Sequence, residues 1–271
     1  MDAEAFRRFE HEGWESLPDS YHRAFASLTG QSVAPLLDAA RVGKGTRALD
    51  VATGPGYVAV AAAARGARVT AVDFSRAMVE RARRDHPGID FLEGDAEALG
   101  FGDASFDAVV MNYGLLHLAR PDQAIGEAHR VLRPGGRFAF TVWLPPERTI
   151  GFGLVLEAIG KHGRMDVPVP PGPPFFRFGD PLEARRSLEA AGFAGVDSRE
   201  VAQTWKLPEP EALFRFMSTS TVRTGALLRA QSPAGLSAIG EAVTLRARVY
   251  RKGDTIELPM PALLSWGHRE R

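Results

Sequence analysis

Residues 49–59, LDVATGPGYVA, pass from an apolar, strand-like run through two glycines into a helical pattern. A strand that turns into a helix through glycines lets a ligand approach the backbone closely at the carboxyl edge of a parallel sheet. The spacing Gly54-x-Gly56-x-x-Ala59, with Asp73 nineteen residues after Gly54, also fits the dinucleotide fingerprint, which is a weak signal on its own. The loop predicts a nucleotide-type ligand. Glycines that serve only tight packing are the alternative.

Strand and helix patterns alternate around this loop. Short apolar runs predict strands at residues 46–51, 68–72, 89–92, 106–111 and 137–143. Helical patterns lie between them at residues 56–64, 76–84 and 121–132, and Ser75 stands where the N-cap of the second helix belongs. Five such units in succession predict an α/β fold with a doubly wound sheet.

The two flanks of this core differ from it. Residues before Gly43 have helical patterns with aromatic spacing, and five prolines crowd into residues 168–174. Further helices are expected at residues 180–191, 209–217 and 233–249, and strands at residues 195–205 and 255–266. We therefore expect a single domain with a helical lid (1–43), a cofactor-binding core (44–145) and a substrate cap that includes the final two strands (146–271).

Composition excludes several classes of protein. The 271 residues carry 33 basic and 33 acidic side chains and no cysteine, which excludes disulfides, thiolate nucleophiles, iron–sulfur clusters and cysteine-ligated zinc. A net charge of zero argues against a strong field for nucleic acid. The first residues lack a secretory pattern, and no apolar run approaches the roughly 20 residues of a membrane span. We expect a cytoplasmic monomer or homodimer with no membrane or nucleic-acid partner.

Acidic side chains at the strand ends narrow the ligand class. Asp50 would repel a pyrophosphate but could accept a hydrogen bond from an ammonium group. Asp73 can accept from ribose hydroxyls, and Asp95 from an exocyclic adenine amine, with Asn112 ending the next strand. None of the four tyrosines has a lysine four residues later, as a short-chain dehydrogenase would require. The pattern favours a cationic nucleotide that carries an amino acid.

Five segments together carry a family resemblance: LDVATGPG, VTAVDFS, EGDAEALGF, FDAVVMNYGLLHL and VLRPGGRFAF, from Thr46 to Trp143. In order and spacing the chain resembles a class I S-adenosylmethionine-dependent methyltransferase of the ubiquinone- and menaquinone-biosynthesis-like branch. The resemblance implies a Rossmann-like sheet of seven strands with the last strand antiparallel, S-adenosylmethionine as cofactor and S-adenosylhomocysteine as product. Ala52 departs from the family, in which many members have glycine there.

The resemblance also implies a cofactor site. Gly54 and Gly56 would lie against the methionine and ribose parts of the cofactor. Asp73 would bind the ribose hydroxyls, and Asp95 would fix the adenine edge with the Ala96 backbone. Phe74 and Met78 would pack near the adenine, and the Asn112 carbonyl would face the methionine ammonium. Related proteins hold the methionine carboxylate near Thr29 and Gln31. The full expected set is Thr29, Asp50, Ala52, Gly54, Gly56, Asp73, Phe74, Met78, Asp95, Ala96, Asn112 and Tyr113.

The acceptor site must come from the divergent segments. Methyl transfer needs an aligned nucleophile and excluded water, and aromatic walls suit both tasks. Most aromatic rings are expected in the core, and the expected acceptor contacts are Trp14, Tyr21, His117, Trp143 and Phe176. These walls predict a small, partly apolar acceptor, aromatic or heteroaromatic and natural-product or quinone-like, methylated at carbon, nitrogen or oxygen.

His117 follows the fourth strand and is the best candidate for removing a proton from the acceptor, with Tyr21 as a second catalytic residue. A packing or orienting histidine is an equally good interpretation of His117. No Asn/Asp-Pro-Pro-Tyr loop follows the fourth strand, which argues against nucleic-acid acceptors, and no acidic cluster follows it, which predicts metal independence. A cofactor fold used for a non-methylating reaction, or an NAD-dependent oxidoreductase, remain alternatives.

Overall fold

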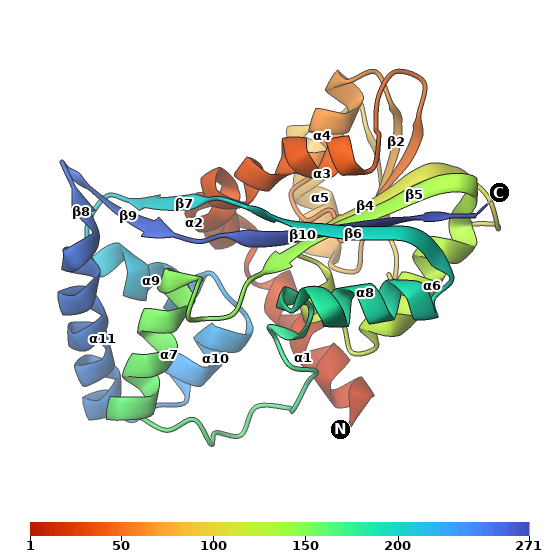
Figure 1. Cartoon of the computed structure of the whole chain (residues 1–271). Coiled ribbons are helices and arrows are strands. Elements are labelled where there is room, and N and C mark those ends of the chain that lie inside the picture. The colour runs from red at the N-terminus through yellow and green to blue at the C-terminus, as the bar shows by residue number, and fades with distance from the viewer. Residues whose placement is uncertain (271) are drawn as a thin grey trace.

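A seven-stranded sheet forms the centre of the molecule in this computed structural model, which describes residues 1–270. The strand order is β3-β2-β1-β4-β5-β10-β6 (Figure 1). The strands are β1 Arg47–Val51, β2 Arg68–Asp73, β3 Asp90–Glu93, β4 Phe106–Asn112, β5 Leu132–Trp143, β6 Phe193–Val201 and β10 Ala262–Arg269. The first five are parallel, and β10 runs antiparallel to both β5 and β6. The predicted Rossmann-like α/β sheet with an antiparallel last strand is confirmed.

Helices cover both faces of this sheet (Figure 1). On one face lie α3 Val33–Ala39, α4 Tyr57–Ala64 and α5 Arg76–Asp85; on the other lie α6 Pro121–Val131 and α8 Pro181–Ala190. The predicted N-cap is present, because the Ser75 hydroxyl accepts a hydrogen bond from the Met78 amide at 3.2 Å. Val109, Val110 and Phe140 on the central strands are fully buried, since helices exclude water from both faces.

A second group of elements stands at one end of the sheet (Figure 1). It comprises the helices α7 Ile150–His162, α9 Glu211–Thr219, α10 Arg223–Arg229 and α11 Pro233–Ala247 and a small sheet of order β7-β9-β8, with β7 Thr204–Leu207, β8 Arg251–Lys252 and β9 Thr255–Pro259. The remaining elements are α1 Ala3–Glu15, α2 Pro18–Thr29 and the 3₁₀ turns Gly30–Ser32, Leu115–His117, Arg177–Gly179 and Arg248–Tyr250.

Two predicted strands were wrong in extent. Residues 195–205 and 255–266 each divide between the main sheet and the small sheet, as β6 and β7 and as β9 and β10. Pro259 and Pro261 interrupt the second segment, and a proline cannot donate to a strand ladder. The Met260 amide donates to the Gln203 carbonyl at 2.9 Å, so the two segments pass from one sheet to the other at the same place. This crossover connects the cap to the core.

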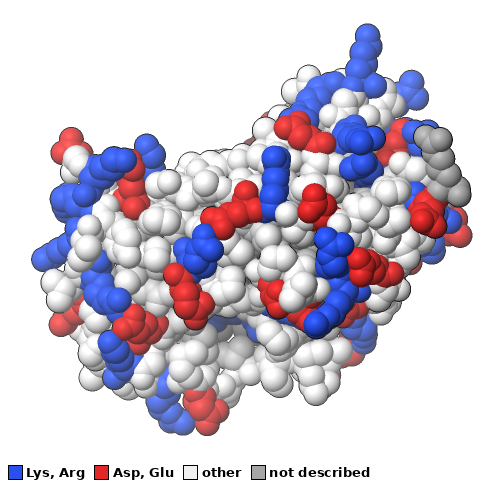
Figure 2. Space-filling view, in the orientation of Figure 1, with Lys and Arg blue, Asp and Glu red and all other residues white. Residues whose placement is uncertain are grey.

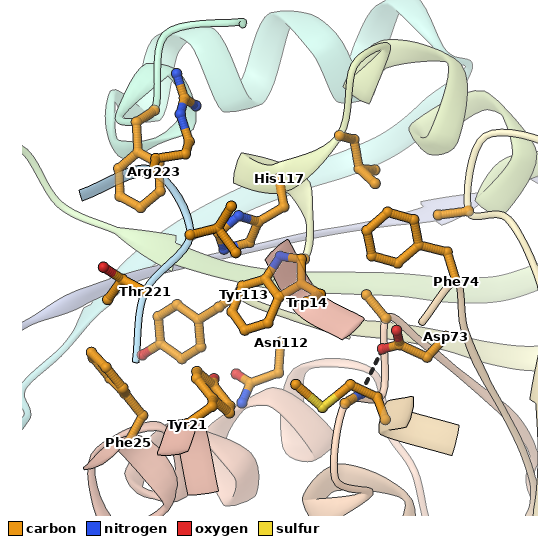
Figure 3. Close-up of a pocket in the computed structure, with 18 of the residues that line it drawn as sticks. Trp14, Tyr21, Phe25, Asp73, Phe74, Asn112, Tyr113, His117, Thr221 and Arg223 are labelled. Carbon is orange, nitrogen blue, oxygen red and sulfur yellow. Dashed lines mark hydrogen bonds between the residues drawn. The ribbon is translucent and has the colours of Figure 1, made fainter. Parts of the chain in front are cut away.

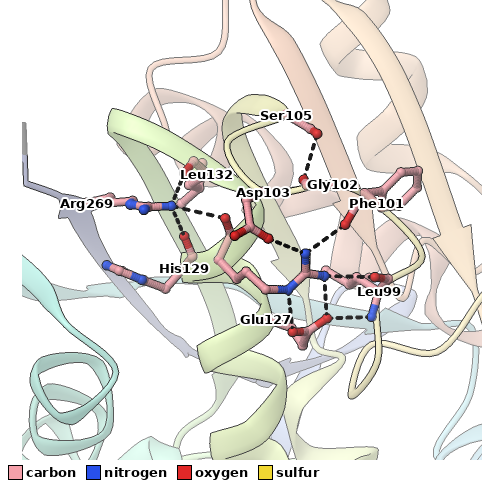
Figure 4. Close-up of polar contacts among 10 residues, drawn as sticks. Leu99, Phe101, Gly102, Asp103, Ser105, Glu127, His129, Leu132 and Arg269 are labelled. Carbon is pink, nitrogen blue, oxygen red and sulfur yellow. Dashed lines mark hydrogen bonds and ion pairs between the residues drawn. The ribbon is translucent and has the colours of Figure 1, made fainter.

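Arg130 on α6 holds the loop between β3 and β4. Its guanidinium donates to the carbonyls of Leu99 and Phe101 and pairs with Glu127 and Asp103 (Figure 4). Glu127 in turn accepts a hydrogen bond from the Leu99 amide at 2.7 Å. These charge-assisted bonds fix the second half of the loop beside the start of β4, at the edge of the sheet opposite the carboxyl ends of the strands.

One face of the molecule shows no dominant sign of charge. Figure 2 shows basic and acidic side chains intermixed over most of one face, as the equal numbers of each predict. No helix within residues 1–270 is long and apolar enough to cross a membrane.

Candidate active site

A cavity opens at the carboxyl ends of β1, β2 and β4 and continues under α1 and α2 toward the cap (Figure 3). One end is lined by small and acidic residues of the core, and the other by aromatic rings and by the segment that enters α10. The lining residues are Trp14, Tyr21, Phe25, Ala52, Gly54, Asp73, Phe74, Met78, Gly94, Asp95, Ala96, Asn112, Tyr113, Gly114, His117, Leu118, Trp143, Phe152, Phe175, Ser220, Thr221, Val222, Arg223 and Thr224.

The glycine loop is built from left-handed backbone. Ala52, Gly54 and Gly56 have φ angles of 55°, 53° and 89°. A side chain at Gly54 would meet no protein atom within 4 Å, so it would project into open space beside the cavity. A side chain at Gly56 would instead collide with Phe91, so this glycine is needed for packing. The Ala52 methyl group, at a position where many family members have glycine, is accommodated because Gly114 opposite it has no side chain.

Asp73 is the last residue of β2, and its side chain hydrogen-bonds to the glycine loop that follows β1. Its Oδ2 atom accepts from the Gly54 amide at 2.7 Å (Figure 3). Its Oδ1 atom accepts from the Ser75 amide at 2.9 Å. The residue is 6% exposed, and this burial raises the pKa of Asp73 to about 6, although both amide hydrogen bonds favour the ionised form. Asp73 is thus a buried carboxylate on the cavity wall with unused acceptor capacity.

Asp50 lies one layer deeper, behind the cavity wall. Its Oδ2 atom accepts from the Thr53 hydroxyl at 2.6 Å, whereas the buried Oδ1 atom has no partner within residues 1–270. Burial raises the pKa of Asp50 to about 7, and the nearby Asp73 charge adds to the shift. A buried carboxylate oxygen without a donor is costly, because desolvation disfavours its charged form.

Asn112 and Asp95 reach the cavity, but both side chains already have protein partners. The Asn112 side chain donates to the Thr29 carbonyl and accepts from Ser32 and Thr141. Asp95 pairs with Arg7 of α1 at 2.6 Å. Thr29 itself is buried and does not line the cavity. An adenine edge at Asp95 would therefore have to share the carboxylate with the lid or displace Arg7.

The aromatic end brings together residues from three parts of the chain. The Trp14 ring packs edge-on against Tyr21 at 5.2 Å and against His117 at 4.8 Å between centroids. Tyr113 stacks on Trp143 at 4.1 Å, and its hydroxyl hydrogen-bonds to the Gln203 side chain. The structure therefore gathers four of the five expected acceptor contacts.

The fifth expected acceptor contact, Phe176, packs on Phe152 behind the wall, and its neighbour Phe175 lines the cavity instead. Burial raises the pKa of Tyr21 to about 12, so its hydroxyl keeps its proton at neutral pH. Tyr21 can therefore donate a hydrogen bond, but it cannot act as a base near pH 7.

Sequence reasoning missed two parts of this site. Residues 220–224, which join α9 to α10 and form the first residues of α10, line the cavity although no pattern marked them. Glu10 of α1 is fully buried and bonds to both His117 and Trp14. The spacing of Phe6, Glu10 and Trp14 puts this carboxylate on the apolar face of its helix, which was an available signal.

The residues present fit the adenosyl cofactor that the resemblance implies. The open space at Gly54 accepts a close ligand, and Asp73 offers acceptor capacity for a diol. The unpartnered Asp50 oxygen suits a cationic amine near the loop. Within residues 1–270 no group of three or more histidine, aspartate or glutamate side chains could hold a metal ion.

Comparisons with known proteins agree with this geometry. Residues 49–140 match a family model described as a methyltransferase domain. A demethylmenaquinone methyltransferase of Renibacterium salmoninarum is 41% identical over 111 residues, which are 41% of this chain and 47% of the relative. The chain spans about half the length of the curated relatives it matches. The predicted resemblance to an S-adenosylmethionine-dependent methyltransferase is confirmed for the core segment.

Solved structures share the fold over most of the chain. Phosphoethanolamine N-methyltransferase 2 of Haemonchus contortus, in complex with phosphomonomethylethanolamine and S-adenosylhomocysteine, has a TM-score of 0.59 at 18% identity, covering 98% of this chain and 60% of that one. The 4+2 cyclase SpnF has a TM-score of 0.54 at 23% identity, covering 89% of this chain and 82% of that one. At such identities these structures establish the fold alone.

Proposed function

Because residues 49–140 match a family model described as a methyltransferase domain, we propose that the whole chain is an S-adenosylmethionine-dependent enzyme that methylates a small molecule. The acceptor is partly apolar and aromatic or heteroaromatic, of a quinone-like or natural-product type, and the methyl group goes to carbon, nitrogen or oxygen. One observation carries the proposal: a single cavity joins the Gly54–Asp73 end to an aromatic end that contains His117.

The core end of the cavity would hold the cofactor, which supplies an electrophilic methyl group when bound. Asp73 would accept from the ribose hydroxyls, Gly54 would give room for close approach, and Asp50 would attract the methionine ammonium through its unpartnered oxygen. Phe74, Met78 and Ala96 line the same end and would surround the adenine. Tyr113, with φ of 59°, places its backbone beside Asn112 at the border of the two ends.

The aromatic end would bind and activate the acceptor. His117 would accept the proton that the acceptor loses, and the neutral Tyr21 hydroxyl would donate a hydrogen bond to it. Trp14 and Trp143 would form walls that exclude water and favour a flat acceptor. We propose that residues 1–43, 44–145 and 146–271 serve as lid, core and cap of one domain.

The decisive experiment incubates the purified chain with methyl-labelled S-adenosylmethionine and a panel of phenols, hydroquinones and aromatic amines. We expect label in at least one acceptor, together with S-adenosylhomocysteine binding by calorimetry. Binding without transfer to any acceptor would favour a non-methylating use of the fold. Tight binding of NADH without S-adenosylhomocysteine binding would favour an oxidoreductase.

Replacing His117 with glutamine should lower kcat by about 100-fold, because no other imidazole lines the cavity of the described chain to accept the proton. S-adenosylhomocysteine affinity should stay within about twofold, since His117 is expected at the acceptor. His129→Gln is the matched control: His129 packs on Phe193 and lies outside the cavity lining. Unchanged turnover in His117→Gln would show that the histidine only packs or orients.

Chelation should leave turnover unchanged. The residues facing the cavity supply a proton acceptor and a hydrogen-bond donor, His117 and Tyr21, for an activation step that requires no Lewis acid. We expect the initial rate after dialysis against EDTA to stay within about twofold of the untreated rate. A loss of activity that added magnesium or zinc restores would contradict the prediction of metal independence.

A further inference from the structure

Glu10 is a fully buried carboxylate on α1 that the proposed reaction has not used. Its Oε2 atom lies 3.0 Å from His117 Nδ1 and accepts from Trp14 Nε1 at 3.2 Å. Its Oε1 atom has no hydrogen-bond partner within residues 1–270 and lies 4.0 Å from Arg223 Nε. A buried carboxylate needs a specific reason, because desolvation is costly without paired charge and hydrogen bonds.

The contact fixes which nitrogen of His117 carries the proton. Trp14 Nε1 can only donate, so Oε2 accepts from it, and because an ionised Glu10 carries no proton, Nδ1 of His117 then donates to Oε2 as well. A neutral His117 therefore has its lone pair on Nε2, and Nε2 has no hydrogen bond within the described residues. Since His117 lines the cavity, Nε2 is the ring nitrogen left to meet a bound acceptor.

The helix that carries Glu10 is held in place on both sides. Arg7 pairs with Asp95 of the core, and Glu4 pairs with Arg120 at 2.8 Å. On the cap side, a side chain at Gly13 would collide with Val222, so helix and cap are in close contact there. The charged groups that face His117 are Glu10 of α1, Arg223 of α10 and, through space, Asp73 of β2.

We propose that Glu10 is a positioning residue that holds His117 in its Nδ1–H form and stabilises the imidazolium formed when Nε2 accepts the proton of the acceptor. The inference rests on the proposed function and deepens it. Because Glu10 belongs to the lid and His117 to the core, the base is complete only when α1 is closed over the cavity. Arg223 balances the buried carboxylate when His117 is neutral.

The test is Glu10→Gln, which keeps the volume and one acceptor oxygen but removes the charge. We expect kcat to fall about 30-fold, S-adenosylhomocysteine affinity to change less than about twofold, and the acid limb of the kcat profile to move to lower pH by about one unit. Glu12→Gln on the exposed face of the same helix is the matched control and should behave like the unmodified protein.

A double-mutant cycle separates positioning from general damage. If Glu10 acts through His117, then Glu10→Gln should cost nothing further in the His117→Gln background. Additive losses, or an acid limb that stays in place, would overturn the proposal even if kcat falls. The thermal midpoint of each variant shows whether it remains folded.

A second measurement does not depend on turnover. Nitrogen-15 spectra of histidine-labelled protein without cofactor should show His117 as the Nδ1–H tautomer, and Glu10→Ala should shift the population toward Nε2–H. An Nε2–H tautomer in the unmodified protein would overturn the positioning role. If this signature is present and no acceptor is ever methylated, the proposed function fails while the Glu10–His117 contact stands.

Discussion

Replacing Asp73 with asparagine is expected to weaken S-adenosylhomocysteine binding by about 100-fold, corresponding to about 3 kcal/mol. Two effects add in the same direction. The carboxylate charge that would strengthen the hydrogen bonds to a ribose diol is lost. In addition, the Gly54 and Ser75 amides each donate to one oxygen of Asp73, whereas asparagine offers only one oxygen. One of the two backbone amides would then face the side-chain NH2 group, which is also a donor. Isothermal titration at pH 7.5 measures the change.

The raised pKa of Asp73, about 6, adds a pH dependence to this prediction. As the pH falls through 6 the carboxyl group takes up a proton, loses its charge and binds the diol less tightly. Affinity of the unmodified protein should therefore decline between pH 7.5 and pH 5, and this component should be absent from Asp73→Asn.

Asp107→Asn is the control for Asp73→Asn, because Asp107 pairs with Arg47 and Arg133 away from the cavity lining. If Asp73→Asn and the unmodified protein bind S-adenosylhomocysteine with equal affinity, Asp73 does not contribute to cofactor binding.

The core of the fold could be predicted because its signals are local. The buried runs of β1 and β4, the glycines after β1 and the Ser75 cap each follow from neighbouring residues. Parallel strands bring their carboxyl ends to one edge, so Asp73 and Asn112 could be placed at one site before any coordinates. The antiparallel last strand, in contrast, was expected from the family resemblance and not from these local signals.

The cap could not be predicted in this way, because tertiary contacts decide it. Whether residues 255–266 stay in one sheet depends on a distant contact. The Gln203 carbonyl accepts a hydrogen bond from the Met260 amide, more than fifty positions away in the sequence. Phe175 and Phe176 are chemically identical neighbours in an irregular segment, so no pattern says which one faces the cavity. Glu10 gave a signal, a carboxylate on an apolar helix face, but its partner His117 is 107 positions away.

Replacing Asp50 with asparagine is expected to stabilise the protein without ligand while weakening its binding of the cofactor. The pKa of Asp50 is raised to about 7 in the folded protein and is near 3.8 when the chain is unfolded. Between these values the folded state binds more protons than the unfolded state, so the free energy of unfolding falls as the pH rises. The loss begins near pH 4 and is complete above pH 7.

The variant carries no such ionisation, so its advantage should grow from near zero at pH 4 to about 4 kcal/mol at pH 8. Urea unfolding at pH 5 and pH 8 measures this difference. Asp107→Asn is again the matched control, because it is the same substitution away from the cavity lining.

The cofactor should reverse the order of stability. A methionine ammonium near the unpartnered Oδ1 atom of Asp50 would favour the charged carboxylate, so binding recovers the free energy that burial costs. Asparagine cannot do this, and S-adenosylhomocysteine affinity should fall about 30-fold, since each factor of ten is about 1.4 kcal/mol. At saturating ligand the unmodified protein should gain more stability than Asp50→Asn. If the variant is less stable at pH 8 and binds the cofactor equally well, then Asp50 serves only to hold Thr53 and the loop.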